Sequence, residues 1–186
     1  MTRPSTRRSD TGTGTRLKRL LAVALMVATL GACMSNPGTG KYDPLPVKSQ
    51  QETLDWARQL IAHLVQTVGI EINSEPEEAG FHPCIGRNGE SAPDGRYTLL
   101  YFVHSDVPGA RHNDVVRSAR DLLTKEGLKV TVYREATDTK PSVALWTRHP
   151  ESNYTVRVDS TSDKRMALSV TTPCLMPPSA SPAPTQ

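Results

Sequence analysis

The chain has 186 residues, with 22 lysines and arginines against 19 aspartates and glutamates and a formal net charge of +3. Its length suits one domain with a modest hydrophobic core. The first 32 residues carry six of the basic side chains and one acidic side chain, so the rest of the chain has 16 basic and 18 acidic side chains and a net charge of −2. The basic excess therefore belongs to the N-terminal segment, which argues against a nucleic-acid-binding protein.

The N-terminal segment has the layout of an export signal. An apolar run over residues 20–32 follows a basic leader, and it is shorter than the roughly 20 apolar residues that a transmembrane helix needs. The run ends in Leu-Gly-Ala-Cys at 30–33, which resembles the lipobox of bacterial lipoprotein precursors. This resemblance implies that residues 1–32 are a cleaved signal peptide and that the thiol of Cys33 receives a diacylglycerol group. A plain secretory signal with an incidental cysteine is the alternative.

A lipid on Cys33 would hold the protein on the outer, extracytoplasmic side of the cell membrane. Two acyl chains anchor a protein firmly in a bilayer, whereas one chain binds only marginally. Residues 33–48 are rich in proline and glycine and predict a flexible tether. Residues 175–186 are rich in proline, serine and alanine and predict a disordered tail. We expect the sequence between them, residues 49–174, to form a single globular domain.

Two cysteines remain for the domain, Cys84 and Cys174. An even pair in an oxidising, exported setting favours a disulfide. The bond would close a loop of about 90 residues, for which the loop-entropy model gives about 4 to 5 kcal/mol of stabilisation. Two free thiols and a metal site are the alternatives. His82 lies close to Cys84 in the sequence, but one histidine and two cysteines fall short of a four-ligand zinc site.

Apolar residues recur at helical spacing over residues 49–68 and again over residues 110–126. The first helix is expected to begin at a capping box, in which a serine and the glutamate three residues later satisfy each other's backbone amides. Both helices are expected to end at a glycine, and the second to end in a Schellman cap. These terminal residues are Ser49, Glu52 and Gly69 in the first helix and Gly127 and Leu128 in the second.

Five further segments have the composition and alternation of strands. The first of them is apolar on both faces, which indicates a central strand. In the second, Leu128, Val130 and Val132 are expected to share one face. The acidic region 71–95, before the first strand, is expected to be a loop with one short strand at most. The five predicted strands are residues 96–105, 128–132, 143–148, 154–158 and 166–170.

This order of elements is helix, strand, helix and then four strands joined by short turns. A run of strands with short connections favours an antiparallel sheet, and two amphipathic helices can cover one of its faces. We therefore predict an α+β fold in two layers, with a mainly antiparallel sheet of about five strands and two helices on one face. The strand–helix–strand unit over residues 97–134 is interpreted as a crossover connection.

The sequence has none of the motifs that mark common hydrolases, phosphate-binding loops or zinc proteases. His104 and His112 flank a short loop that also contains Asp106, and a histidine–aspartate arrangement can perform acid–base chemistry. Polar residues also collect where a strand turns into a helix, which is the simpler interpretation. A cluster of acidic residues lacks the spacing of a calcium-binding loop and is expected to be solvated. This cluster comprises Glu71, Glu75, Glu77 and Glu78.

The lipobox, the stretch RNGESAPDGRYTLLYFV at 87–103 and the stretch TTPCLMPP at 171–178 together resemble small lipoproteins of actinobacteria, a group to which no activity is assigned. We expect a non-enzymatic module without a cofactor that binds a protein or an envelope component. A small hydrolase that uses the two histidines, or an inhibitor or immunity-type lipoprotein, is the alternative. Trp56 and Trp146 are expected to pack in the core or at its edge, and an exposed Trp146 would instead suggest a sugar platform.

Overall fold

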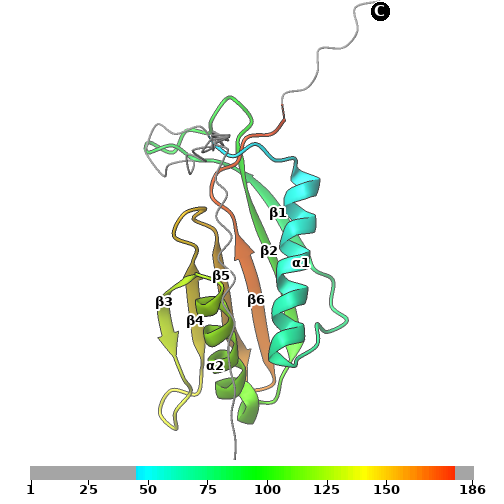
Figure 1. Ribbon diagram of the computed structural model, residues 1–186, viewed down its shortest axis with the longest axis vertical. Coiled ribbons are helices and arrows are strands. Elements are labelled where there is room, and N and C mark those ends of the chain that lie inside the picture. The colour runs from blue at the N-terminus through cyan, green and yellow to red at the C-terminus, as the bar shows by residue number, and fades with distance from the viewer. Residues whose placement is uncertain (1–44, 179–186) are drawn as a thin grey trace, which may run out of the picture. The chain divides into compact units, whose positions relative to one another are not determined.

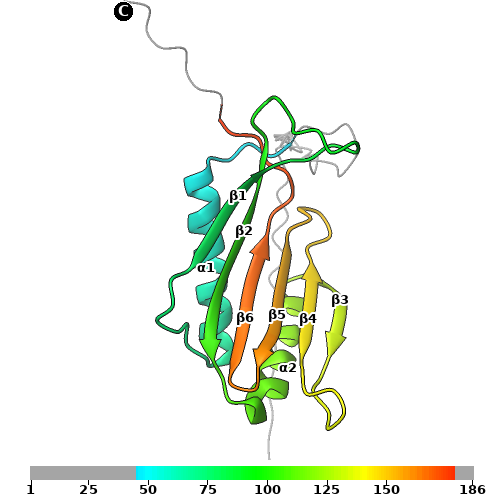
Figure 2. The ribbon, with the colours of Figure 1, turned by 180° about the vertical axis from the view of Figure 1, so that it is seen from behind.

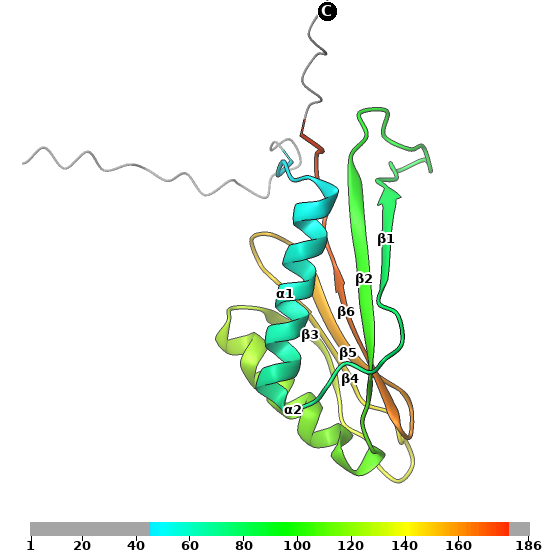
Figure 3. The same ribbon diagram turned by 90° about the vertical axis from the view of Figure 1, so that its right-hand side faces the viewer.

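The computed structural model describes residues 45–178, which form two layers, a six-stranded sheet and a pair of helices (Figure 1, Figure 3). The predictions for the signal peptide, for lipidation at Cys33 and for most of the tether and tail lie outside the described residues. In chain order the elements are α1 (Gln50–Val68), β1 (Glu78–Pro83), β2 (Tyr97–Asp106), α2 (Gly109–Lys125), β3 (Lys129–Arg134), β4 (Ala144–Arg148), β5 (Thr155–Ser162) and β6 (Arg165–Thr171).

The strands are arranged in the order β1-β2-β6-β5-β4-β3, and every neighbouring pair is antiparallel. The last four strands form the expected meander, and β6 then pairs with β2 in the middle of the sheet. The α+β, two-layer prediction is confirmed, with one strand more than expected. The additional strand is β1, in the region predicted to be mostly loop. Its sequence EAGFHP has a single large apolar residue, Phe81, so it shows little alternation.

Both helices cover the same face of the sheet. The first lies mainly against β2 and β6, and the second lies against β3, β4 and β5. The other face of the sheet carries no helix, as the view from behind shows (Figure 2). Between the layers the largest fully buried apolar side chains are Ile61, Leu64, Leu99, Leu123, Leu145, Met166 and Leu168. They come from both helices and from three strands, so the two layers share one core.

The predicted helix ends are present. Ser49 caps α1, where its hydroxyl accepts a hydrogen bond from the Glu52 amide and the Glu52 carboxylate accepts one from the Ser49 amide, and Gly69 ends the helix with a left-handed φ of 69°. After α2, Gly127 has a φ of 91°. The Gly127 amide donates to Thr124 and the Leu128 amide donates to Leu123, which is the Schellman pattern.

The prediction that Leu128, Val130 and Val132 share one face of their strand is wrong. Leu128 is buried and Val130 points the same way at the edge of the sheet, but the pairing with β4 shifts between Val130 and Val132. This bulge turns Val132 to the helix-free face, because its cross-strand partner Trp146 points there. Tyr133 takes the place of Val132 against the core. An extra residue in one strand changes the face of all that follow, and period-two reasoning does not detect it.

The ordered domain extends beyond the expected limits of 49–174 at both ends. The Lys48 amide donates to the Met176 carbonyl at 2.9 Å, and Leu175, which is buried, exchanges backbone hydrogen bonds with Tyr97. The first residues of the predicted tail therefore belong to the folded domain. Within residues 45–178, neither helix has the length and hydropathy that crossing a membrane would require.

Candidate functional site

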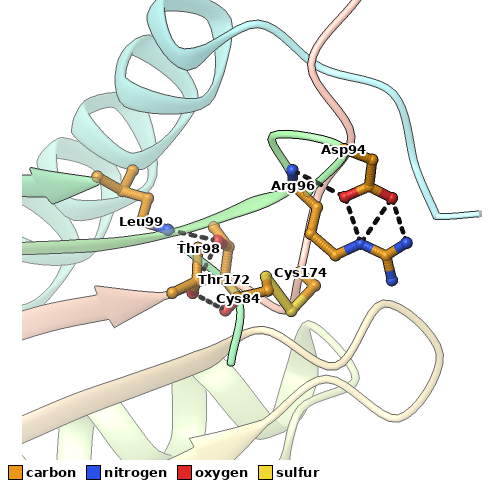
Figure 4. Close-up of a disulfide and its surroundings, with 7 residues drawn as sticks. All are labelled: Cys84, Asp94, Arg96, Thr98, Leu99, Thr172 and Cys174. Carbon is orange, nitrogen blue, oxygen red and sulfur yellow. Dashed lines mark hydrogen bonds and ion pairs between the residues drawn. A yellow bond between two sulfur atoms is a disulfide. The ribbon is translucent and has the colours of Figure 1, made fainter. Parts of the chain in front are cut away.

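The predicted disulfide is present at one end of the sheet (Figure 4). The Sγ atoms of Cys84 and Cys174 are 2.13 Å apart, so the bond joins the β1–β2 loop to the segment that follows β6. Thr172, in the segment after β6, contacts β2: its hydroxyl accepts a hydrogen bond from the Leu99 amide at 2.9 Å and its carbonyl accepts one from Thr98 at 2.6 Å. The disulfide therefore holds the β1–β2 loop, and these hydrogen bonds hold β2, against the segment that follows β6.

The disulfide also excludes these two cysteines as metal ligands. Their thiols are used by the bond, and His82 is an exposed residue whose ring lies over Gly80. Across residues 45–178, no three histidine, cysteine or acidic side chains come together in a way that could hold a metal ion.

The histidine pair considered for acid–base chemistry is divided between the two faces of the sheet. His104 lies on the helix-free face, where its Nδ1 is 3.2 Å from Glu75 Oε2. His112 is fully buried in α2, and its Nε2 is 2.8 Å from the Val107 carbonyl oxygen. Asp106 accepts a hydrogen bond from Asn73 at 3.1 Å rather than from either histidine. The structure therefore does not assemble the three residues into one site.

The acidic region contains ion pairs. Glu75 is 2.8 Å from Arg165 on β6, in addition to its contact with His104. Glu77 is paired with Arg58 on α1 and accepts a hydrogen bond from the Tyr101 hydroxyl at 2.9 Å. Burial and this hydrogen bond raise the pKa of Tyr101 to about 12. These carboxylates fasten the loop after α1 to the domain, a role that the sequence did not suggest.

Within residues 45–178 no helix or second sheet covers the helix-free face of the sheet (Figure 2), and we call it the open face. The registers align one row across five strands, from Phe102 through Ser169, Arg157 and Trp146 to Val132. The neighbouring rows are aligned in the same way. The open face comprises Thr98, Leu100, Phe102 and His104 on β2, Ala167, Ser169 and Thr171 on β6, Thr155, Arg157 and Asp159 on β5, Trp146 and Arg148 on β4, and Val132 and Arg134 on β3.

Trp146 is held in a defined position on the open face. The guanidinium carbon of Arg157 is 4.4 Å from the centre of the indole ring, and the indole N–H donates to Asp159 Oδ1 at 2.9 Å. Burial raises the pKa of Asp159 above its ordinary value. The hydrogen bond from Trp146 and the charge of Arg157 oppose this rise only in part. In the sequence Arg157 alternates with the apolar Val156 and Val158, so it falls on the polar side of its strand together with Asp159. This alternation did not show that both contact Trp146, because that depends on the register between strands.

Next to Arg157 the open face is hollowed. The hollow has a volume of about 640 Å³ and extends from Arg157 over Leu100 and Thr171 to the disulfide. Ile85, which is 60 % exposed, stands at its rim. The hollow is therefore bounded by an apolar side chain on one side and by a guanidinium on the other.

A smaller pocket lies at the start of α1 and shares Thr172 and Pro173 with the lining of the hollow. It encloses about 190 Å³ between Trp56, Tyr154 and Leu175. The two aromatic rings meet edge to face with centroids 5.0 Å apart, and Trp56 packs against the core. The prediction that Trp56 packs at the edge of the core is therefore confirmed, whereas Trp146, on the open face, is 36 % exposed.

Comparison of the chain with known protein families, with curated proteins and with solved structures finds no match. Function must therefore be inferred from the geometry of the chain itself. Among the described residues, the open face combines exposed apolar side chains, a hollow and charged groups in fixed positions. It is the candidate functional site.

Proposed function

We propose that the protein is an extracytoplasmic lipoprotein, anchored in the cell membrane through Cys33, whose folded domain is a non-enzymatic binding module. The export signal and lipobox of the sequence support the anchor. The ligand is a protein or a component of the cell envelope, and the open face is the surface that receives it.

The observation that carries this proposal is the exposure of large apolar side chains next to the hollow of the open face. Leu100 is 38 % exposed, Trp146 36 % and Ile85 60 %. The helix-free face of an antiparallel sheet is commonly polar, because it is solvated. Covering apolar surface releases about 25 cal/mol for each Å² removed from water, so a partner seated here would gain stabilisation.

The surroundings of His104 favour a binding module over a small hydrolase. Its ring is engaged by Glu75, and the neighbouring Ser105 is fully buried with its hydroxyl donated to the Glu71 carbonyl at 2.6 Å. A serine in that position has no access to a substrate. An inhibitor or immunity-type lipoprotein would be a special case of the binding module, with a protein as its ligand.

The proposal is tested by site-specific photo-crosslinking in intact cells. A photoreactive amino acid replaces Ser169, which lies in the middle of the open face, and in a matched strain it replaces Gln59, which is exposed on α1. We expect one recurring adduct from position 169 and none from position 59, with the captured molecule identified by mass spectrometry.

The Cys33→Ser variant tests the anchor in the same cells. We expect it to lose the lipid, to leave the membrane fraction and to lose the adduct at position 169 if the ligand is confined to the envelope. Equal adducts from positions 169 and 59, or none from either, would contradict the assignment of the open face. Retention of Cys33→Ser in the membrane fraction would contradict the anchor.

A further inference from the structure

Three arginines of the open face lie near Trp146 in the register of the sheet. Arg157 lies directly across from Trp146 on β5, and Arg148 is two residues along β4. Arg134 is two residues beyond Val132, the partner of Trp146 on β3. On a sheet these positions are about 5 to 8 Å from Trp146 between Cα atoms. Arg157 is stacked on the indole ring, while Arg134 and Arg148 flank Trp146 in the register of the same face, and we call these four residues the arginine cluster.

None of the three arginines forms an ion pair with a carboxylate within residues 45–178. Arg134 donates to Ser142, Arg148 donates to Asn153, and Arg157 is held by its stacking on the ring. Arg87 and Arg111 likewise form no ion pair within these residues, whereas five other arginines pair with acidic residues. Those paired arginines are Arg58, Arg96, Arg117, Arg120 and Arg165.

The positive charge of the cluster is only partly compensated. The charges of Arg157 and Arg134 act on Asp159, so this carboxylate offsets part of the positive charge. Lys129 adds a further cation, since it lies directly opposite Arg148 in the register of β3 and β4. Like charges directly opposite each other on a sheet are destabilising. An anionic ligand would relieve this repulsion.

Arg157 is already oriented for such a ligand. Stacking on Trp146 fixes the plane of its guanidinium group, and none of its N–H groups donates a hydrogen bond within the described part of the chain. A fixed, planar guanidinium is suited to bidentate bonds with a carboxylate or a phosphate. Arg157 also lines the hollow together with Leu100 and Thr171. A ligand bound by Arg157 can therefore extend into the hollow of the open face.

We infer that the arginine cluster binds an anionic glycan, a sugar polymer that carries carboxylate or phosphate groups. This inference rests on the proposed function and deepens it by naming the chemical class of the ligand. The anionic groups are bound by the guanidinium groups. The sugar hydroxyls lie over the hydroxyl groups of the neighbouring strands, Thr155 on β5 and Ser169 and Thr171 on β6.

Two observations favour a glycan over an acidic protein segment. Arg157 lies over one face of the Trp146 ring, which leaves less of the indole to serve as the apolar anchor that protein interfaces favour. The free edge of β3 is bulged and carries Lys129 and Arg134, features that discourage a peptide from adding as a further strand. What the surface offers is hydrogen-bond donors and hydroxyl groups.

The test uses the purified full chain and three polymers in a binding titration at low salt. Polygalacturonate carries carboxylates, phosphodextran carries phosphates, and plain dextran is neutral. We expect binding to at least one charged polymer, weakening as salt is added because salt screens exposed charges, and no binding to dextran. Binding to dextran with equal affinity, or to none of the three, would overturn the inference. The crosslinking result at position 169 does not depend on this outcome. A failure of the glycan inference can therefore be distinguished from a failure of the proposed binding function.

Charge-matched variants locate the site. The double variant Arg148→Gln/Arg157→Gln should bind about tenfold more weakly or worse, since a lost hydrogen bond to a charged group is worth about a factor of ten. The double variant Lys125→Gln/Lys164→Gln loses the same charge from exposed positions outside the cluster and should bind as the native chain does. Equal losses in both double variants would overturn the inference.

Asp159→Asn provides a test in the opposite direction. The amide oxygen can still accept the indole N–H of Trp146, while the negative charge is removed. Binding should become roughly two- to threefold tighter, as Coulomb's law gives for one exposed charge about 7 Å away. Unchanged or weaker binding would contradict the inference. Poly-glutamate is the competing probe: if it binds more tightly than the charged glycans, the ligand is an acidic protein and the glycan assignment is wrong.

Discussion

Removal of the Cys84–Cys174 disulfide is expected to lower the free energy of unfolding by about 4 to 5 kcal/mol. The two cysteines are 90 residues apart in the chain. In the loop-entropy model, removing the crosslink from a loop of that length raises the entropy of the unfolded chain and lowers its free energy by about this amount. Single domains commonly have unfolding free energies of about 5 to 15 kcal/mol. The domain without the bond should therefore be folded but only marginally stable.

The structure indicates that the native sheet survives this change. The Cys84 amide donates to the Arg96 carbonyl within the β1–β2 loop, and the Leu99 amide donates to the Thr172 hydroxyl, which holds β2 to the segment after β6; neither bond needs the sulfur atoms. The loss should therefore come mainly from the unfolded chain, which becomes less compact. The slope of unfolding free energy against urea should rise accordingly, because more surface is exposed on unfolding.

The assay is urea unfolding of the oxidised chain, the reduced chain and the Cys84→Ala/Cys174→Ala variant, followed by tryptophan fluorescence and by circular dichroism. The reduced chain and the double alanine variant should agree with each other and unfold at much lower urea than the oxidised chain. If the unfolding free energies of all three differ by less than about 1 kcal/mol, far below the expected value of about 4 to 5 kcal/mol, the disulfide does not stabilise the domain through loop entropy.

Three further predictions concern the core, a helix end and an ion pair. Leu168→Ala, at a fully buried position, should cost about 2 to 5 kcal/mol in urea unfolding, whereas Leu100→Ala on the open face should cost less than about 1 kcal/mol. Gly127→Ala should cost about 1 kcal/mol in the same assay, since its φ of 91° strains any residue with a Cβ atom; no loss would mean that the α2 cap is not held in this conformation. Hydrogen bonds from Arg117 lower the pKa of Glu135 to about 2, so this ion pair stabilises the fold fully above the ordinary pKa near 4.5 and is lost as the pH falls toward 2. Arg117→Gln should raise the pKa of Glu135 toward its ordinary value in a carbon-detected NMR titration, and an unchanged pKa would contradict the pairing.

Much of the domain could be predicted from local patterns. The capping box at Ser49, the glycine ends of both helices and the inward faces of β2, β5 and β6 follow from interactions between residues close together in the sequence. The disulfide was predictable because only two cysteines remain once Cys33 is set aside. The strand β1 was not, since its pairing with β2 rather than its own composition makes it a strand.

The candidate site could not be predicted in the same way. His104 and His112 are close in sequence, but the alternation of β2 and the turn into α2 place them on opposite sides of the sheet. Trp146 is 11 residues from Arg157 and 13 from Asp159 in the chain, and it meets them only when β4 and β5 pair in one particular register. A shift of one residue would turn Arg157 toward the core.

The sequence by itself determined the helices, most of the strands, their buried faces and the cysteine pair. These depend on the period of apolar residues, on the residues that cap the helices and on the number of cysteines. Only the tertiary structure decided the strand order, the bulge in β3 and the row that joins Phe102, Arg157 and Trp146 across the open face. Strand register depends on how the sheet packs as a whole, since β2 pairs with β6 across about half of the domain's sequence. No local pattern contains that information.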